Sequence, residues 1–198
     1  LRQVLFHPVD TFKHLNTNVT LFNAIVYAIA GGMVGSLFGG LWQYIASTTG
    51  LWENSGMEMF YGSLFGLTTL WMMSPFIILI SLVIISAITH LFLRMTGETA
   101  PFAVTLKVFA YSQGSSAPLG IVPFCGSIAS AVWALVCSVS GLSAAHKVST
   151  ARSLFAVFAP LIICCVCVVV AVSIAISMGL MAAMSQMEGM SFLKNFIK

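Results

Sequence analysis

Charged residues are the scarcest class in this sequence: Asp, Glu, Lys and Arg make up 7% of its 198 residues, whereas 59% are hydrophobic. An ordinary soluble domain carries about 25% charged residues, so this chain has too few to cover a surface that faces water. We therefore expect an integral membrane protein. At roughly 20 apolar residues per helical span, its length allows about four to six spans and leaves no room for a separate catalytic domain.

Clusters of metal-ligating residues are also lacking. None of the five cysteines has a histidine or a carboxylate at metal-ligand spacing, and Cys164, Cys165 and Cys167 lie within one apolar run. We expect the cysteines to be small, reduced, buried hydrophobic residues. Because no carboxylate lies within a predicted span, we expect no catalytic site, no cofactor and no bound metal.

The first fifteen residues, LRQVLFHPVDTFKHL, lack the apolar core and the cleavage site of a signal peptide. Val4 and Phe12 suit one face of a helix, and Arg2 and Lys13 suit the other. We expect residues 1–16 to form an amphipathic helix on the cytoplasmic membrane surface. A helix that binds a partner protein is the alternative.

Long apolar runs occupy most of the remaining chain and predict an all-α bundle of about five membrane-spanning helices. The predicted spans are residues 21–45, 64–93, 99–119, 123–145 and 154–184, and residues 186–198 are predicted to form a short amphipathic tail at the membrane surface. Pro75 predicts a kink in the second span or the start of its regular part. Pro160 lies near the start of the last span.

Five spans divide the few charges unevenly between the two sides of a membrane. Arg2, Lys13, Arg94, Lys147 and Arg152 fall on one side, and Glu53, Glu58 and Glu188 fall on the other with Lys194 and Lys198. Cytoplasmic loops carry the excess of Lys and Arg. We therefore expect a cytoplasmic N terminus and an external C terminus.

The first predicted span contains GGMVGSLFGG, in which glycines recur at helical spacing. Gly31, Gly35 and Gly39 lie four residues apart, beside Gly32 and Gly40. Small residues at this spacing form a flat face that lets a second helix approach closely. We expect this packing face to contact a helix of the same chain; a helix of another copy is the alternative.

The uncharged stretch FAYSQGSSAPLGIVPFCG, residues 109–126, is interrupted by glycine and proline. Broken backbone at membrane depth is tolerated only against protein or a water-filled cavity. The stretch is therefore either a turn between two spans at the membrane surface or a loop inside the bundle. Lys107 either reaches the membrane surface or faces protein or water. The candidate pathway or hinge residues are Lys107, Tyr111, Ser112, Gly114, Pro118 and Pro123.

Two histidines and three cations are predicted at one membrane surface. His90 and His146 lie at the ends of the second and fourth spans, and Arg94, Lys147 and Arg152 follow them. We expect the two histidines to face each other across the bundle. The leading interpretation is that the histidines are structural residues at the membrane surface. The alternative is a site for an anion, such as a lipid phosphate, which neighbouring cations favour over a metal.

Four pieces of sequence carry a family resemblance. They are LFHPVDTF at residues 5–12, the span ending at His90 with GET at 97–99, the sequence AYS…AP…IVP…G within 110–126, and Trp133 followed by GLSAAH at 141–146 and STAR at 149–152. In this order they resemble the compact prokaryotic form of the Yip family, membrane proteins named for interaction with Ypt/Rab GTPases. The resemblance implies five spans with a cytoplasmic N terminus.

Eukaryotic members of that family are associated with vesicle traffic and membrane shaping. We find neither their longer cytosolic N-terminal region nor their acidic aromatic motif at the entry of the second span, where WMMSPF at residues 71–76 is a poor match. We therefore do not carry a Rab-binding role over to this chain.

Two functions of different classes fit these features. The leading hypothesis is a non-catalytic membrane protein that packs with other membrane proteins or with itself, to organise the bilayer or assemble a complex. The alternative is a transporter or channel element, with an ion, solute or lipid moving along a path lined by the broken helix at residues 107–126. The two differ in whether Lys107, Tyr111 and Ser112 face a hydrated cavity or packed protein. The expected partners are lipid and other membrane proteins, not nucleic acid.

Overall fold

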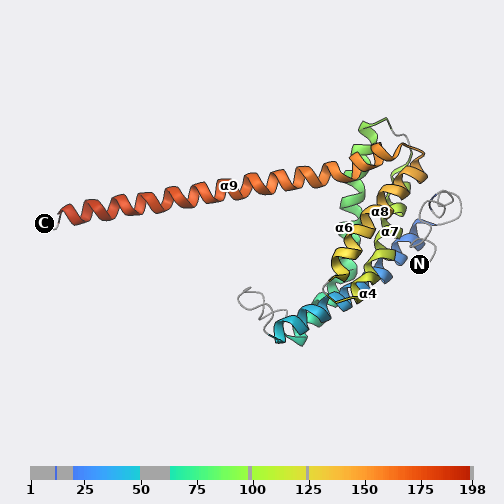
Figure 1. Cartoon of the computed structure of the whole chain (residues 1–198), viewed down its shortest axis with the longest axis horizontal. Helices are drawn as coiled ribbons and strands as arrows, with labels where there is room; N and C mark the ends of the chain where they lie inside the picture. The colour runs from blue at the N-terminus through green and yellow to red at the C-terminus, as the bar shows by residue number, and fades with distance from the viewer. Residues whose placement is uncertain (1–11, 13–19, 50–62, 98–99, 124, 197–198) are drawn as a thin grey trace. The chain divides into compact units, whose positions relative to one another are not determined.

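The computed structural model describes residue 12 and residues 20–49, 63–97, 100–123 and 125–196, except for the side chains of residues 164, 175 and 179–196. Its elements are α4 (Leu21–Thr48), α6 (Leu64–Met95), α7 (Phe102–Ser116), the 3-10 helix η1 (Ala117–Ile121), α8 (Gly126–His146) and α9 (Thr150–Phe196) (Figure 1). No residue within the described ranges forms a strand, and the predicted all-α fold is confirmed.

The chain divides into two compact units, Leu1–Val157 and Phe158–Lys198. The first unit contains α4, α6, α7, η1, α8 and the first turns of α9, and it holds both candidate sites discussed below. The second unit consists of the rest of α9. The predicted surface helix at residues 1–16 lies outside the described residues except for Phe12, whose fully buried ring lies next to Gly141 of α8.

Four helices are long and apolar enough to cross a membrane: α4, α6, α8 and the Thr150–Met178 part of α9. Helix α7, with 15 residues, is shorter than a usual span, but it continues into the five residues of η1. At about 1.5 Å per α-helical residue and about 2.0 Å per 3-10 residue, the two together extend about 32 Å. This length matches the hydrocarbon thickness of a bilayer, about 30 Å.

Side-chain hydroxyls define the start of two spans and repair an interruption in one of them. Thr20 and Ser63 accept hydrogen bonds from the backbone N–H groups of Asn23 and Gly66, at the beginnings of α4 and α6. Inside α6, Pro75 has no N–H to donate to the carbonyl of Trp71. The hydroxyl of Ser74 donates to that carbonyl at 2.7 Å, so α6 continues through Pro75 as one helix.

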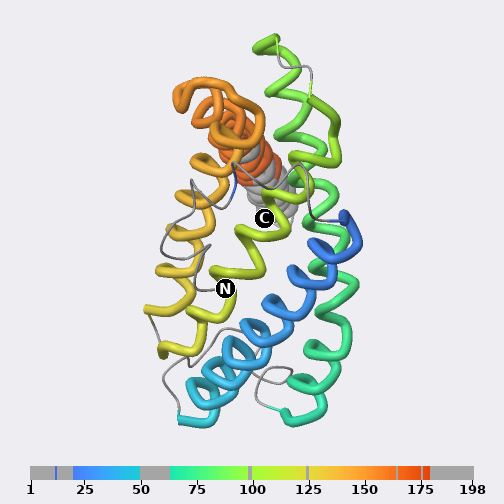
Figure 2. Tube along the Cα trace, turned by 90° about the vertical axis from the view of Figure 1, so that its right-hand side faces the viewer, coloured from blue at the N-terminus to red at the C-terminus, as the bar shows by residue number. Residues whose placement is uncertain are grey.

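Helix α7 is the central helix of the first unit. It packs against α4, α6 and α8, and Figure 2 shows it between α8 on one side and α4 and α6 on the other. Ten of its 15 residues are buried. The surrounding helices expose apolar side chains outward, including Phe65 and Phe76 of α6 and Ile128 of α8. The unit therefore has one buried helix and an outer surface suited to lipid.

The glycine face of α4 explains how α7 comes so close. A Cβ atom at Gly31 would overlap the carbonyl of Gly114 in α7, and one at Gly35 would lie 2.6 Å from the carbonyl oxygen of Ala117. Gly32 and Gly40 contact α6, where an added Cβ would lie 2.6 Å from Ile78 and from Leu67. The glycines therefore pack within the chain, against two helices. Gly39 differs from the other four, because a Cβ there would meet nothing within 4 Å.

Two predictions about the last helix and the cysteines need correction. Helix α9 runs without a break from Thr150 to Phe196, whereas a span at residues 154–184 and a separate tail at 186–198 were predicted. Residues 180–188, LMAAMSQME, have no proline and many good helix formers, so nothing local ends the helix there. Among the cysteines expected to be buried, Cys137 is buried, whereas Cys125, Cys165 and Cys167 are exposed.

The glycine contacts predict opposite effects for two similar substitutions in α4. Gly31→Ala places a methyl group into the backbone of α7, and we expect it to destabilise the protein by about 1–3 kcal/mol or more. Gly39→Ala meets open space and restores helix propensity, so we expect it to stabilise the protein by up to about 1 kcal/mol. Thermal unfolding of the purified protein in detergent, followed by tryptophan fluorescence, checks both variants. Equal melting temperatures would contradict the assigned contacts.

Candidate functional site

Three polar side chains from three helices meet at one end of α7. Thr105 of α7 is fully buried, with its hydroxyl 2.9 Å from Nδ1 of His90 in α6 and 3.1 Å from Nε2 of His146 at the end of α8. The two imidazole rings lie 6.4 Å apart between centroids. The structure therefore brings His90 and His146 together through Thr105, a residue that was not identified from the sequence.

Arg94 sets the direction of one of these hydrogen bonds. Its Nε–H donates to Nε2 of His90 at 3.5 Å, which requires an unprotonated Nε2 and therefore a proton on Nδ1. His90 Nδ1–H then donates to the Thr105 hydroxyl, and this hydroxyl also forms a hydrogen bond with Nε2 of His146. Arg94, His90, Thr105 and His146 are thus joined by consecutive hydrogen bonds. We call these four residues the histidine chain.

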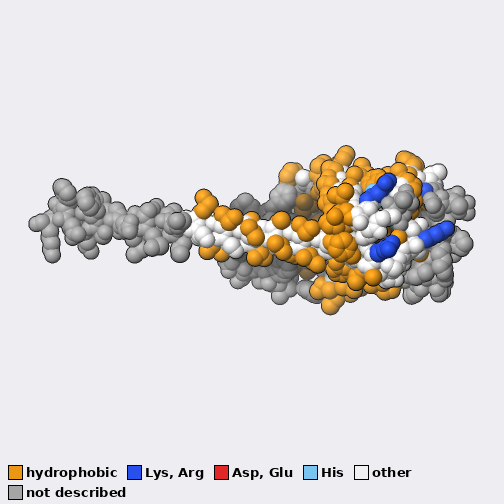
Figure 3. Space-filling model, turned by 90° about the horizontal axis from the view of Figure 1, so that it is seen from above, with side chains coloured by type: hydrophobic (Ala, Val, Ile, Leu, Met, Phe, Trp, Pro, Cys, Tyr) orange, Lys and Arg blue, Asp and Glu red, His pale blue; other side chains and the backbone are white. Residues whose placement is uncertain are grey.

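Exposed cations lie at the helix ends next to the two histidines in the sequence. Arg94 lies in the last turn of α6, Lys147 follows α8, and Arg152 lies in the first turn of α9, all three exposed. Lys147 adopts the left-handed conformation with φ of 56°, which ends α8 and turns the chain toward α9. Figure 3 shows Lys and Arg side chains on this part of the molecule, with no acidic side chain in view among the described residues. His146, in contrast, is 6% exposed, so the cations rather than this histidine are available to an external anion.

The candidate pathway or hinge residues do not line one common cavity. Ser112 is fully buried, Tyr111 packs on Tyr27 with ring centroids 5.1 Å apart, and Gly114 lies against Tyr27 and Gly31. The other three members are partly buried or exposed: Lys107, Pro118 and Pro123. Next to Ser112, the hydroxyl of Ser115 lies 2.9 Å from that of Tyr27. This part of α7 faces packed protein.

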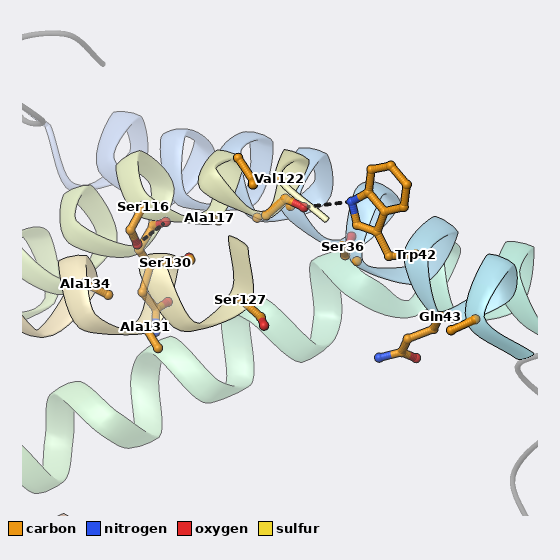
Figure 4. Close-up of a pocket in the computed structure, with 16 residues that line it drawn as sticks. Ser36, Trp42, Gln43, Ser116, Ala117, Val122, Ser127, Ser130, Ala131 and Ala134 are labelled. Atoms are coloured by element: carbon orange, nitrogen blue, oxygen red, sulfur yellow. Dashed lines mark hydrogen bonds between the residues drawn. The ribbon is translucent and has the colours of Figure 1, made fainter. Parts of the chain in front are cut away.

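A cavity of about 540 Å³ lies at the other end of α7. Residues of α4, α7, η1 and α8 line it (Figure 4). Near its outer end, the indole Nε1–H of Trp42 donates to the carbonyl oxygens of Gly120 and Ile121, both at 3.2 Å, which fixes the ring. Val122 and Pro123 follow η1, and α8 begins at Gly126.

The polar lining of this cavity was not identified from the sequence. It consists of Ser36, Gln43, Gln113, Ser116, Ser127 and Ser130, beside glycine and alanine. These residues come from three helices and no local motif links them. Three of the glycines first assigned to helix packing, Gly32, Gly35 and Gly39, also line the cavity. A helix face with small residues can therefore border a cavity as well as a neighbouring helix.

The comparisons with known proteins give one match. The family model of the Yip1 domain matches residues 2–192, which confirms the resemblance seen in the sequence. Neither a curated protein nor a solved structure matches the chain.

The histidine chain predicts a specific cost for removing its central hydroxyl. Thr105→Val keeps the shape of the side chain but removes the group shared by two imidazoles, so we expect a loss of about 1–3 kcal/mol in stability. Thr69→Val is the matched control, because Thr69 donates only to the carbonyl of Phe65 in its own helix. Thermal unfolding in detergent compares the two. If the two variants have the same melting temperature, the histidine chain contributes nothing to stability.

Proposed function

Because this chain belongs to the Yip1-domain family of integral membrane proteins, we propose that it acts without catalysis, by packing laterally in the membrane with a second copy or with other membrane proteins. In this way it would organise the bilayer or assemble a membrane complex. The observation that carries the proposal is the exposed and almost wholly apolar surface of α9 between Cys165 and Ile174.

Every side chain from Cys165 to Ile174 is exposed. Ten consecutive residues cover nearly three helical turns, so they point in all directions around the helix. Nine of the ten are Val, Ile, Ala or Cys, with Ser173 as the exception. The hydroxyl of Ser173 donates to the carbonyl of Val169 in the same helix, so it does not need water. A helix that is apolar all round requires hydrocarbon or protein around it.

The sequence of α9 also contains small residues at the spacing that favours helix pairing. Cys167, Ala171, Ala175 and Gly179 each lie four residues after the previous one. Such a stripe lets two helix backbones approach closely, and van der Waals packing then stabilises the pair in lipid. A stripe on one copy can pair with the same stripe on another, as in a symmetric dimer. We therefore propose a second copy as the first partner.

The orientation and lipid contacts belong to the same proposal. We place the histidine chain at the cytoplasmic surface of a bacterial inner membrane, with the C terminus outside, because Lys and Arg gather on the cytoplasmic side of membrane proteins. Exposed Arg94, Lys147 and Arg152 would there contact an anionic lipid headgroup. His90 and His146 would support this site by fixing the helix ends.

Transport is the second candidate, and the cavity favours it. Gln113, Ser116 and Gly120 of the broken segment line the cavity. However, Lys107, Tyr111 and Ser112 are absent from its lining, and Ser112 is fully buried in packed protein. These contacts support a binding cavity at one end of the bundle better than a continuous path, so lateral assembly remains the leading function.

Native cysteines test the proposed pairing of α9. We expect a full-length variant that keeps only Cys167 to form a disulfide-linked dimer when its membranes are oxidised, because a disulfide needs Cα atoms within about 7 Å. A variant that keeps only Cys165 is the matched control, since Cys165 points about 200° away around the helix. Non-reducing electrophoresis measures the dimer fraction.

A packing variant separates specific pairing from random collision. Ala171→Leu in the Cys167 background adds bulk within the stripe, and we expect it to weaken association by about 1–3 kcal/mol. Ser173→Leu adds bulk on the opposite face, because Ser173 points about 200° away from Ala171 around the helix, and should leave the dimer fraction unchanged. Equal cross-linking through Cys165 and Cys167, or none through Cys167, would overturn self-association through this stripe.

A further inference from the structure

The cavity between α4, α7–η1 and α8 is elongated. Its lining along α4 extends from Gly32 to Ala46, a rise of about 21 Å at 1.5 Å per residue. Small residues border much of this length, so the backbones rather than bulky side chains form its wall (Figure 4). Gln43, Ser127 and Ala131 are exposed at its rim. The cavity is therefore open to an entering molecule, and its volume falls within the usual range of ligand sites, about 300–1,000 Å³.

The polar groups of the cavity are available to a ligand. Ser36 and Ser116 donate to carbonyls of their own helices, whereas the side chains of Gln43, Gln113, Ser127 and Ser130 make no hydrogen bond to another residue in the described ranges. Gln113 and Ser130 are also partly buried. These amide and hydroxyl groups can therefore form hydrogen bonds with an occupant of the cavity.

The chemistry of the lining limits the class of that occupant. Among the described residues that line the cavity, none is Asp, Glu, Lys, Arg or His, and a charged group without a partner is expensive at membrane depth. Amides and hydroxyls both donate and accept hydrogen bonds, which matches a ligand with several hydroxyl groups. The fixed indole of Trp42 adds an aromatic surface at the outer end, suited to the apolar face of a sugar ring.

We propose that this cavity binds an uncharged, hydroxyl-rich group such as a sugar or a polyol, either free or carried as the headgroup of a neutral glycolipid. Gln113 and Ser130 hydrogen-bond its hydroxyls in the deeper part of the cavity, and Gln43 and Ser127 do so near the rim. This site is independent of the proposed pairing of α9.

A cysteine at the rim of the cavity can report whether a ligand occupies it, and this substitution removes no polar group from the lining. Ala131→Cys is made in a cysteine-free full-length background and reconstituted in phosphatidylcholine nanodiscs, and its rate of reaction with a maleimide is measured. The additions are monoglucosyl-diacylglycerol, methyl glucoside, diacylglycerol and phosphatidylglycerol. We expect a neutral glucosyl group to slow labelling at least about threefold, and diacylglycerol and phosphatidylglycerol to have no effect. Ile128→Cys, an exposed position on α8 outside the cavity, controls for general effects of the additions.

The arms of the experiment separate the two sources of the ligand. Protection by methyl glucoside as well as by the glycolipid means that the sugar alone suffices, whereas protection by the glycolipid alone means that the ligand is carried on a lipid. Protection by neither, or equal protection by phosphatidylglycerol, would overturn the proposal.

A cavity-filling variant provides the second test. A side chain added at Gly39 meets open space, so Gly39→Leu should occupy the cavity and abolish protection while the protein stays folded. Ser140→Ala is the matched control, because Ser140 lies outside the cavity and donates to the carbonyl of Val136 in its own helix. Its protection should equal that of the parent. If protection persists in Gly39→Leu, the ligand binds elsewhere and the proposed site is wrong.

Discussion

The contact between the backbones of α4 and α7 is the constraint on which the first unit depends. At Gly31 and Gly114 neither helix carries a side chain, and even a methyl group at Gly31 would overlap the other backbone. In a bilayer the lipid tails are as apolar as the helix surface, so burying that surface contributes little free energy. Close van der Waals packing is therefore a main source of helix association. The same approach places Tyr27 beside Ser115 and Trp42 beside Gly120, so it also orders the polar contacts along α7.

The central position of α7 also explains where the polar groups lie. One end of the helix carries Thr105, which joins two histidines from the neighbouring helices. The other end continues into η1. Both α7 and η1 contribute residues to the lining of the cavity, among them Gln113 and Ser116. Outer helices shield these groups from hydrocarbon, as polar residues at membrane depth require. The protein thus combines a lipid-facing outer surface with two distinct polar regions on one buried helix.

Part of this arrangement could be predicted from the sequence because it depends on local patterns. Scarce charge and long apolar runs predicted the helical membrane fold, and the four-residue spacing of Gly31 and Gly35 predicted a packing face. Other features depend on which helices become neighbours. Nothing in the local sequence distinguishes Thr105 from other helical threonines. Its role depends on the packing of α6 and α8, which place His90 and His146 beside it. Gln113 and Ser130 form a cavity only after α7 and α8 have packed, and the open space at Gly39 follows from the divergence of its neighbours.

Side-specific labelling tests most directly whether α7 and η1 together cross the membrane as the central helix. Single cysteines at Val122 and Lys147, both exposed, would be labelled in oriented vesicles with a maleimide that cannot cross the bilayer. A third at Ser112, fully buried, reports the packed middle of α7. The account predicts that Val122→Cys reacts only from outside, Lys147→Cys only from the cytoplasmic side, and Ser112→Cys from neither. Labelling of the first two positions from the same side would contradict it.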